Sequence, residues 1–87
     1  MEDVQVLLND ITNGFPSSHV VREYLESGDS KKIEASALYL LQRDSNFGLS
    51  PEDEANLNYL VDNYSEFLED SEYQEDIVVL YLENNET

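Results

Sequence analysis

The sequence lacks cysteine altogether, and it has only three glycines, two prolines and four basic residues among its 87 residues. Without cysteine, the chain cannot form a disulfide scaffold, a thiolate metal site or a cysteine nucleophile, and its composition fits a reducing compartment. So few glycines and so few bases leave no glycine-rich phosphate loop and no basic patch for nucleic acid. No run approaches the ~20 apolar residues of a membrane-spanning helix, and residues 1–8 lack the basic start of a signal peptide.

These limits leave a single small helical domain covering residues 1–87. A chain of this length buries roughly 60–65% of its unfolded surface, so its core is thin. Hydrophobic residues make up 40% of the sequence, which is too many for a disordered acidic tail. The chain is therefore expected to fold, with modest stability.

What the sequence has in excess is negative charge, with a formal net charge of −16 at pH 7. Residues 1–43 contain seven acidic residues and all four basic residues, whereas residues 44–87 contain thirteen acidic residues and no basic residue. Solubility alone needs a net charge of only about 2–8 for a small domain. So large a negative charge is repelled by nucleic acid and by anionic membranes, which predicts a basic protein as the partner.

Apolar spacing and helix-capping residues predict helices along the whole chain. Apolar residues at i, i+3, i+4 and i+7 over residues 4–11 form one face of a first helix, which Gly14 ends. A second helix, capped by Ser17 or Ser18, carries its own apolar face and ends at Gly28.

A third helix is expected over about residues 31–43, with Asp29 or Ser30 as its cap. Its segment 35–41, ASALYLL, is apolar nearly all round, which predicts a central and buried helix. The segment that follows, DSNFGL at 44–49, is expected to be a loop.

The fourth helix has the clearest start, because Ser50 is a capping residue, Pro51 suits the first helical position and acids fill the first turn. Its apolar stripe consists of Leu57, Leu60, Val61, Tyr64 and Leu68. A capping box at Ser71 predicts a last helix over about residues 72–83, although its β-branched run 77–82 is also compatible with a strand. The inner face of that helix is expected to carry Tyr73, Ile77, Leu80 and Tyr81. Together these patterns predict an all-α fold, a compact bundle of four to five short helices.

The sequence does not indicate catalysis or a metal site. His19, the single histidine, has no nucleophile or carboxylate at a motif spacing. The segment 44–48 is similar to the start of a calcium loop, but its glycine comes one position early and Ala55 stands where the last acidic ligand belongs. Paired carboxylates act as acid and base only in a cleft that shifts their pKa, and so small a bundle has little room for one. We therefore expect no enzyme activity and no cofactor.

The acidic residues of the segment 62–76 break a local rule of helix stability. Negative charge near the C-terminal end of a helix is unfavourable by roughly a few tenths of a kcal/mol, yet Glu66, Glu69 and Asp70 lie there in the fourth helix. Such violations are expected at functional sites. An exposed tyrosine among them, Tyr64 or Tyr73, would be an aromatic anchor for a protein partner. The candidate partner-binding residues are Tyr59, Asp62, Tyr64, Glu66, Glu69, Asp70, Glu72, Tyr73, Glu75 and Asp76.

The segment 21–64 contains, in order, a leucine-bearing helix, a short turn with glycine, an Ala/Leu-rich helix and the sequence Leu49-Ser50-Pro51-Glu52 at the start of another helix. In this order of motifs the chain resembles the Maf-type and contact-dependent-inhibition immunity proteins, which bacteria make against their own toxins. The resemblance covers about half of the chain. It implies a cytoplasmic protein, monomeric in a 1:1 heterocomplex, that binds a basic nuclease toxin domain tightly and blocks its active site.

Other functions stay open at this level. A phage-encoded mimic of nucleic acid, of the anti-restriction or anti-CRISPR type, would also present acids to a basic protein, but along a longer surface. A helical adaptor would instead expose an apolar groove or patch for a partner helix. A small enzyme would have a cleft with convergent polar groups.

Overall fold

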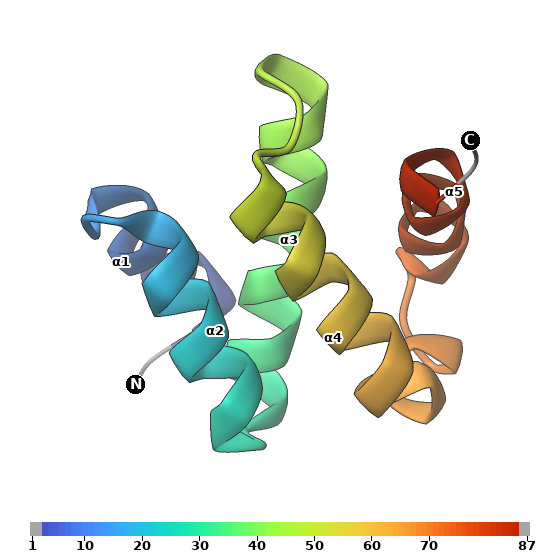
Figure 1. Cartoon of the computed structure of the whole chain (residues 1–87). Helices are drawn as coiled ribbons and strands as arrows, with labels where there is room; N and C mark the ends of the chain where they lie inside the picture. The colour runs from blue at the N-terminus through green and yellow to red at the C-terminus, as the bar shows by residue number, and fades with distance from the viewer. Residues whose placement is uncertain (1–2, 86–87) are drawn as a thin grey trace.

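The computed structural model describes residues 3–85 and contains, over that range, five α-helices joined by short turns and no strand (Figure 1). The helices are α1 (Val4–Asn13), α2 (Ser17–Ser27), α3 (Ser30–Asn46), α4 (Pro51–Glu69) and α5 (Gln74–Asn85). The predicted all-α fold class is confirmed, and residues 77–82 are helical rather than extended.

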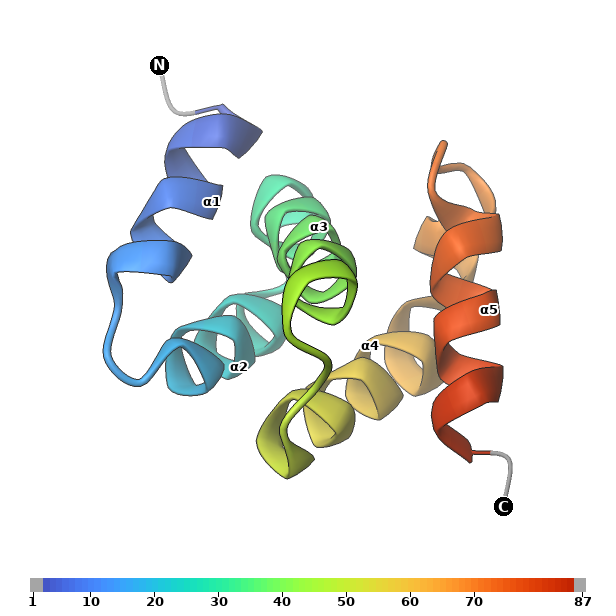
Figure 2. The same ribbon diagram turned by 90° about the horizontal axis from the view of Figure 1, so that it is seen from above.

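The central element is α3, as its apolar segment predicted. It contacts each of the other four helices, and these surround it with α1 and α5 on opposite sides (Figures 1 and 2). Ala35, Ser36 and Ala37 are fully buried, and such small side chains let neighbouring helices approach closely. Leu40 of the same helix is also fully buried. The hydrophobic core of the chain is thus built around α3.

Two predicted helix starts are confirmed in detail. The carboxylate of Asp29 accepts hydrogen bonds from the backbone N–H groups of Lys31 at 2.9 Å and Lys32 at 3.3 Å. The hydroxyl of Ser50 accepts one from the backbone N–H of Asp53 at 3.2 Å. Each cap satisfies N–H groups that have no partner within their own helix, which fixes where α3 and α4 begin.

The predicted cap of α2 is wrong. Pro16 occupies the cap position and Ser17 is already helical. The hydroxyl of Ser17 donates to the carbonyl of Gly14 at 3.2 Å, so it bonds back into the preceding turn rather than to the new helix. Gly28 ends α2 in the left-handed conformation (φ 75°), as expected of a helix-ending glycine.

The prediction that a loop begins at residue 44 is also wrong, because α3 continues to Asn46. The side-chain amide of Asn46 donates to the carbonyl of Gln42 at 2.9 Å and supports this last turn. Gly48, in the left-handed conformation, then closes the helix by donating its N–H to the carbonyl of Arg43 at 3.0 Å. The segment with a partial calcium-loop pattern is therefore a helix end and its cap.

The last helix begins at Gln74, two residues later than predicted. The hydroxyl of Ser71, expected to cap it, instead donates to the carbonyl of Leu68 at 2.7 Å and so completes the end of α4. The carbonyl of Tyr73 accepts the first backbone bond of α5, from the N–H of Ile77 at 3.0 Å. Among the described helices, α5 contacts only α3 and α4, which leaves it at one end of the molecule (Figure 2).

Core truncation provides a test of the central role of α3. We expect Leu40→Ala to lower the free energy of unfolding by about 2–5 kcal/mol, because it leaves a cavity between packed helices. Leu82→Ala is the matched control: Leu82 is 51% exposed, so its truncation should change the free energy by only about 0.5 kcal/mol. Urea unfolding followed by circular dichroism measures both, and similar losses in the two variants would contradict the assignment of the core.

Candidate functional site

The seven acidic residues predicted at 62–76 are all exposed. They lie on one continuous segment: the end of α4, the turn 70–73 and the start of α5, where Figure 1 turns from orange to red. Within residues 3–85, none of these carboxylates takes part in an ion pair or a side-chain hydrogen bond. Their negative charge is therefore available to a cation from outside the chain.

Three of the four basic side chains are held in contacts elsewhere in the molecule and so do not offset this charge. Arg22 donates from Nε to Oδ1 of Asn56 at 2.9 Å, and its guanidinium lies 4.4 Å from the ring centre of Tyr59. Lys32 lies over the ring of Tyr24 at 5.4 Å. These contacts connect α2 to α3 and α4, so the cations contribute to packing rather than to neutralising residues 62–76.

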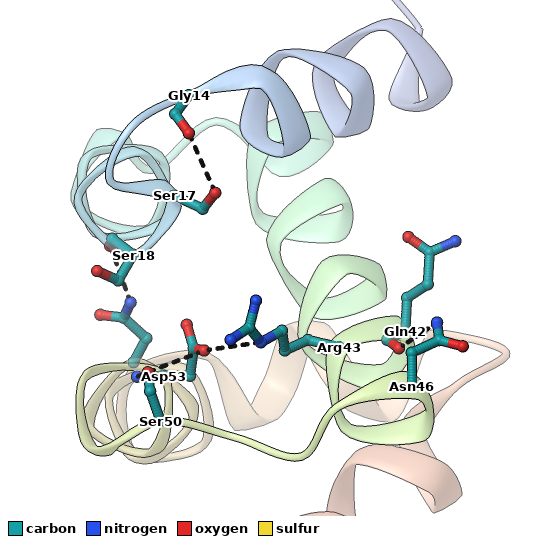
Figure 3. A network of polar contacts seen from close by, with 9 residues as sticks. Gly14, Ser17, Ser18, Gln42, Arg43, Asn46, Ser50 and Asp53 are labelled. Carbon is teal, nitrogen blue, oxygen red and sulfur yellow. Dashed lines mark hydrogen bonds and ion pairs between the residues drawn. The ribbon is translucent and has the colours of Figure 1, made fainter.

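The third held cation, Arg43, belongs to a polar network between α3 and the start of α4 (Figure 3). Its Nε lies 3.7 Å from Oδ2 of the buried Asp53, which also accepts a hydrogen bond from the hydroxyl of Ser50 at 3.0 Å. Asn56, one turn further along α4, donates to the carbonyl of Ser18 in α2 at 3.0 Å. The hydroxyl of Ser50 both accepts from the N–H of Asp53 and donates to its carboxylate, so this serine serves the start of α4.

Two of the three predicted tyrosines connect helices to one another. The hydroxyl of Tyr64 donates to the carbonyl of Leu25, one of the last carbonyls of α2, which lacks a partner within its own helix. Tyr64 also interrupts α4 with a non-helical conformation (φ −130°, ψ 29°), so residues 65–69 follow a kink. The ring of Tyr59 lies 6.3 Å from that of Tyr64 and under Arg22. Both rings are partly buried and hold α4 against α2.

Tyr73 is not an exposed anchor either, since it is only 9% exposed and packs in the core. Its hydroxyl has no hydrogen-bond partner among the described residues. Burial raises the pKa of this hydroxyl well above its usual value, and the negative charge of Glu34 adds to the effect. The expectation that Tyr73 is an exposed aromatic anchor is therefore corrected, whereas its predicted place on the inner face of the last helix is confirmed. For the partly buried Tyr64, a role as anchor stays a prediction.

The structure instead exposes apolar side chains that the sequence analysis did not select. Val78, Val79 and Leu82 of α5 are 40%, 48% and 51% exposed. We call these three residues the α5 strip. The sequence does contain a sign of this exposed strip, because the run 77–82, IVVLYL, makes a helix apolar on two sides. In the fold, α5 has neighbouring helices on only one of these sides.

A groove runs beside the α5 strip, between α5 and the C-terminal part of α3. It encloses about 440 Å³ and is lined by Leu41 and Asp44 of α3 and by Asp76, Val79 and Glu83 of α5, among others. Its walls thus combine apolar and acidic side chains. Over residues 3–85 no three histidine or acidic side chains are placed to hold a metal ion together, and no helix is long and apolar enough to cross a membrane.

Comparison with protein-family models, with curated proteins and with solved structures found no match to this chain. The resemblance to toxin-immunity proteins therefore stays a prediction.

Removal of the side-chain hydroxyl is expected to have opposite effects on stability at Tyr64 and at Tyr73. Tyr64→Phe should lower the free energy of unfolding by about 1 kcal/mol or more, because it leaves the carbonyl of Leu25 without its donor. Tyr73→Phe should be neutral or stabilising near pH 7, because it removes a buried hydroxyl that has no partner. Urea unfolding of the two variants checks this pair, and a larger loss for Tyr73→Phe would contradict the burial geometry.

The raised pKa of Tyr73 also predicts a dependence of stability on pH. In the unfolded chain the hydroxyl ionises near pH 10, whereas in the folded chain it keeps its proton to higher pH. Ionisation therefore favours the unfolded chain, and stability should fall as the pH rises above about 10. Tyr73→Phe should show a shallower fall above about pH 10 than the wild type; identical slopes in urea unfolding would overturn the prediction.

Proposed function

We propose that this protein is a stoichiometric inhibitor that binds a basic protein through the acidic segment 62–76, and that the basic protein is a nuclease toxin domain. The observation that carries the proposal is the set of seven exposed carboxylates that have no cationic partner within residues 3–85. A surface of this kind costs stability through self-repulsion, and solubility alone does not require it.

The mechanism follows from the charges. A nuclease holds its substrate's phosphates with lysine and arginine, and carboxylates placed over such a site offer those cations an alternative anion. The negative field of the free inhibitor steers the basic protein toward residues 62–76 and raises the rate of association. Binding then excludes nucleic acid from the cationic site. Inhibition on this scheme needs one inhibitor per nuclease and no chemistry from the inhibitor.

One structural observation favours a second candidate, a helical adaptor that takes up a partner through apolar contact. The α5 strip is exposed in the manner expected of such a surface. A phage-encoded mimic of nucleic acid shares the proposed electrostatics but would spread its acids over a longer surface. Here seven of them are concentrated on fifteen consecutive residues, 62–76, which favours one local contact.

Charge reversal tests the proposal. Partners are captured from a lysate of the source cell, and the nuclease activity of the captured protein is assayed with and without added inhibitor. Converting Glu66, Glu69 and Asp70 together to lysine should slow association by about tenfold or more at low salt and weaken inhibition, because the charge of three of the seven steering carboxylates is reversed.

The matched control converts Asp10, Glu23 and Glu26 to lysine. These residues are also exposed, but they lie on α1 and α2, and the reversal changes the net charge by the same amount. The control should retain most of the association rate and the inhibition. Equal effects of the two triple variants would mean that only total charge matters, and capture of no nuclease would overturn the proposed function.

A further inference from the structure

The helix α5 has two apolar faces that point in opposite directions. Ile77, Leu80, Tyr81 and Asn84 follow the spacing i, i+3, i+4, i+7 and face the rest of the molecule, with Ile77 and Leu80 buried in the core. Glu75, Val78, Val79 and Leu82 follow the same spacing on the other side of the helix. Each residue of the second set comes two positions before a residue of the first, and two positions correspond to a rotation of about 200° around the axis of an α-helix. The α5 strip therefore points away from the core.

The strip differs from the other exposed apolar residues of the chain. Val6, Phe15 and Phe47 lie on α1, on the turn before α2 and at the end of α3, one on each. Single exposed apolar side chains are normal on a protein surface. Three on adjoining turns of one helix, without a covering element, are characteristic of a contact surface.

Acidic side chains border the strip on the side of the groove. Glu75 lies on the same face one turn before Val78, and Asp76 and Glu83 line the groove together with Val79. All three carboxylates are exposed and have no cationic partner among the described residues. An apolar centre with a charged border is the usual anatomy of a protein interface. Here the border is acidic, so the complementary border is basic.

The same charges argue against a second copy of this chain as the molecule that covers the α5 strip. Two copies meeting through their strips would bring Glu75, Asp76 and Glu83 of one close to those of the other, and residues 44–87 offer no base to offset them. Like charges placed across an interface disfavour association.

We propose that the α5 strip and the adjoining groove form a docking surface for an amphipathic helix of the basic partner, with the helix's apolar residues on Val78, Val79 and Leu82 and its lysines or arginines against Glu75, Asp76 and Glu83. The groove lies between two helices, α3 and α5, and a third helix fits such a groove by its apolar face. This inference rests on the proposed function, because it takes from it a basic protein as partner. It adds that apolar contact at α5 makes up the centre of the interface.

The test uses two synthetic peptides as probes. Both contain leucine, alanine and lysine in the same numbers and span about five helical turns. In one peptide the leucines form a single face bordered by lysine, and in the other they are dispersed around the helix. Binding to the full-length protein is measured by calorimetry at about 0.15 M salt. We expect the peptide with the apolar face to bind at least about tenfold more tightly, because only it can bury the α5 strip.

Variants then locate the contact. Val79→Ser combined with Leu82→Ser should abolish the preference between the two peptides while leaving the weaker, charge-driven binding of the dispersed peptide. Val6→Ser is the control, since Val6 is 44% exposed on α1, and it should keep the full preference. Circular dichroism of each variant shows whether it is folded. If the double variant is unfolded, Val78→Ser alone replaces it.

The outcomes separate the inference from the proposed function. If the two peptides bind equally well, the strip is not used: the inference fails and the acidic docking of a basic partner stands. If neither peptide binds, both fail. If the protein sediments as a dimer that the Val79→Ser and Leu82→Ser substitutions dissociate, a second copy covers the strip and the inference is overturned.

Discussion

The fold depends on the burial of the middle of α3, where residues 35–37, 39 and 40 are buried while Leu38 and Leu41 are partly covered. A chain of this length has little apolar surface to bury, and a helix that is apolar nearly all round is stable only when neighbours surround it. The other four helices do so, while α1 and α5 make no contact with each other. Each outer helix is thereby covered on one side and leaves its other side to solvent. An outer helix ordinarily has a polar face toward solvent, but the outer face of α5 is apolar.

The distribution of charge follows from the packing, because three of the four basic residues lie in contacts between helices. Arg22 and Arg43 bind side chains of α4, and Lys32 packs on Tyr24 of α2. Positive charge is thus placed where helices meet, in the part of the molecule formed by α2, α3 and the start of α4. The end of α4 and the start of α5 carry exposed carboxylates that have no such partner within residues 3–85. Their mutual repulsion falls at the end of the molecule that α5 forms (Figure 2).

How far the sequence predicts the structure depends on whether a feature is local. Asp29, Ser50 and Gly28 were assigned correctly because a cap or a helix-ending glycine acts within a few residues. The end of α3 was missed because Asn46 and Gly48 extend the helix through bonds that the pattern of apolar residues does not record. The inner face of the last helix was assigned correctly, since Tyr73, Ile77 and Leu80 are buried. The exposure of the opposite, apolar face could not be assigned, because it depends on α5 contacting only α3 and α4 among the described helices.

On the proposed function, the acids and the α5 strip would contribute to binding at different stages, which is why their occurrence on one helix matters. A field from unpaired carboxylates acts over about a Debye length and sets how often a basic partner arrives. Burial of valine and leucine acts only at contact and sets how long the partner stays, since affinity differences reside mostly in the rate of dissociation. An acidic surface alone would bind many basic proteins briefly, and an apolar strip alone would not favour a basic partner over others. Glu75, Asp76 and Glu83 border Val78, Val79 and Leu82. One surface would therefore attract a basic partner by its charge and retain that partner by apolar contact.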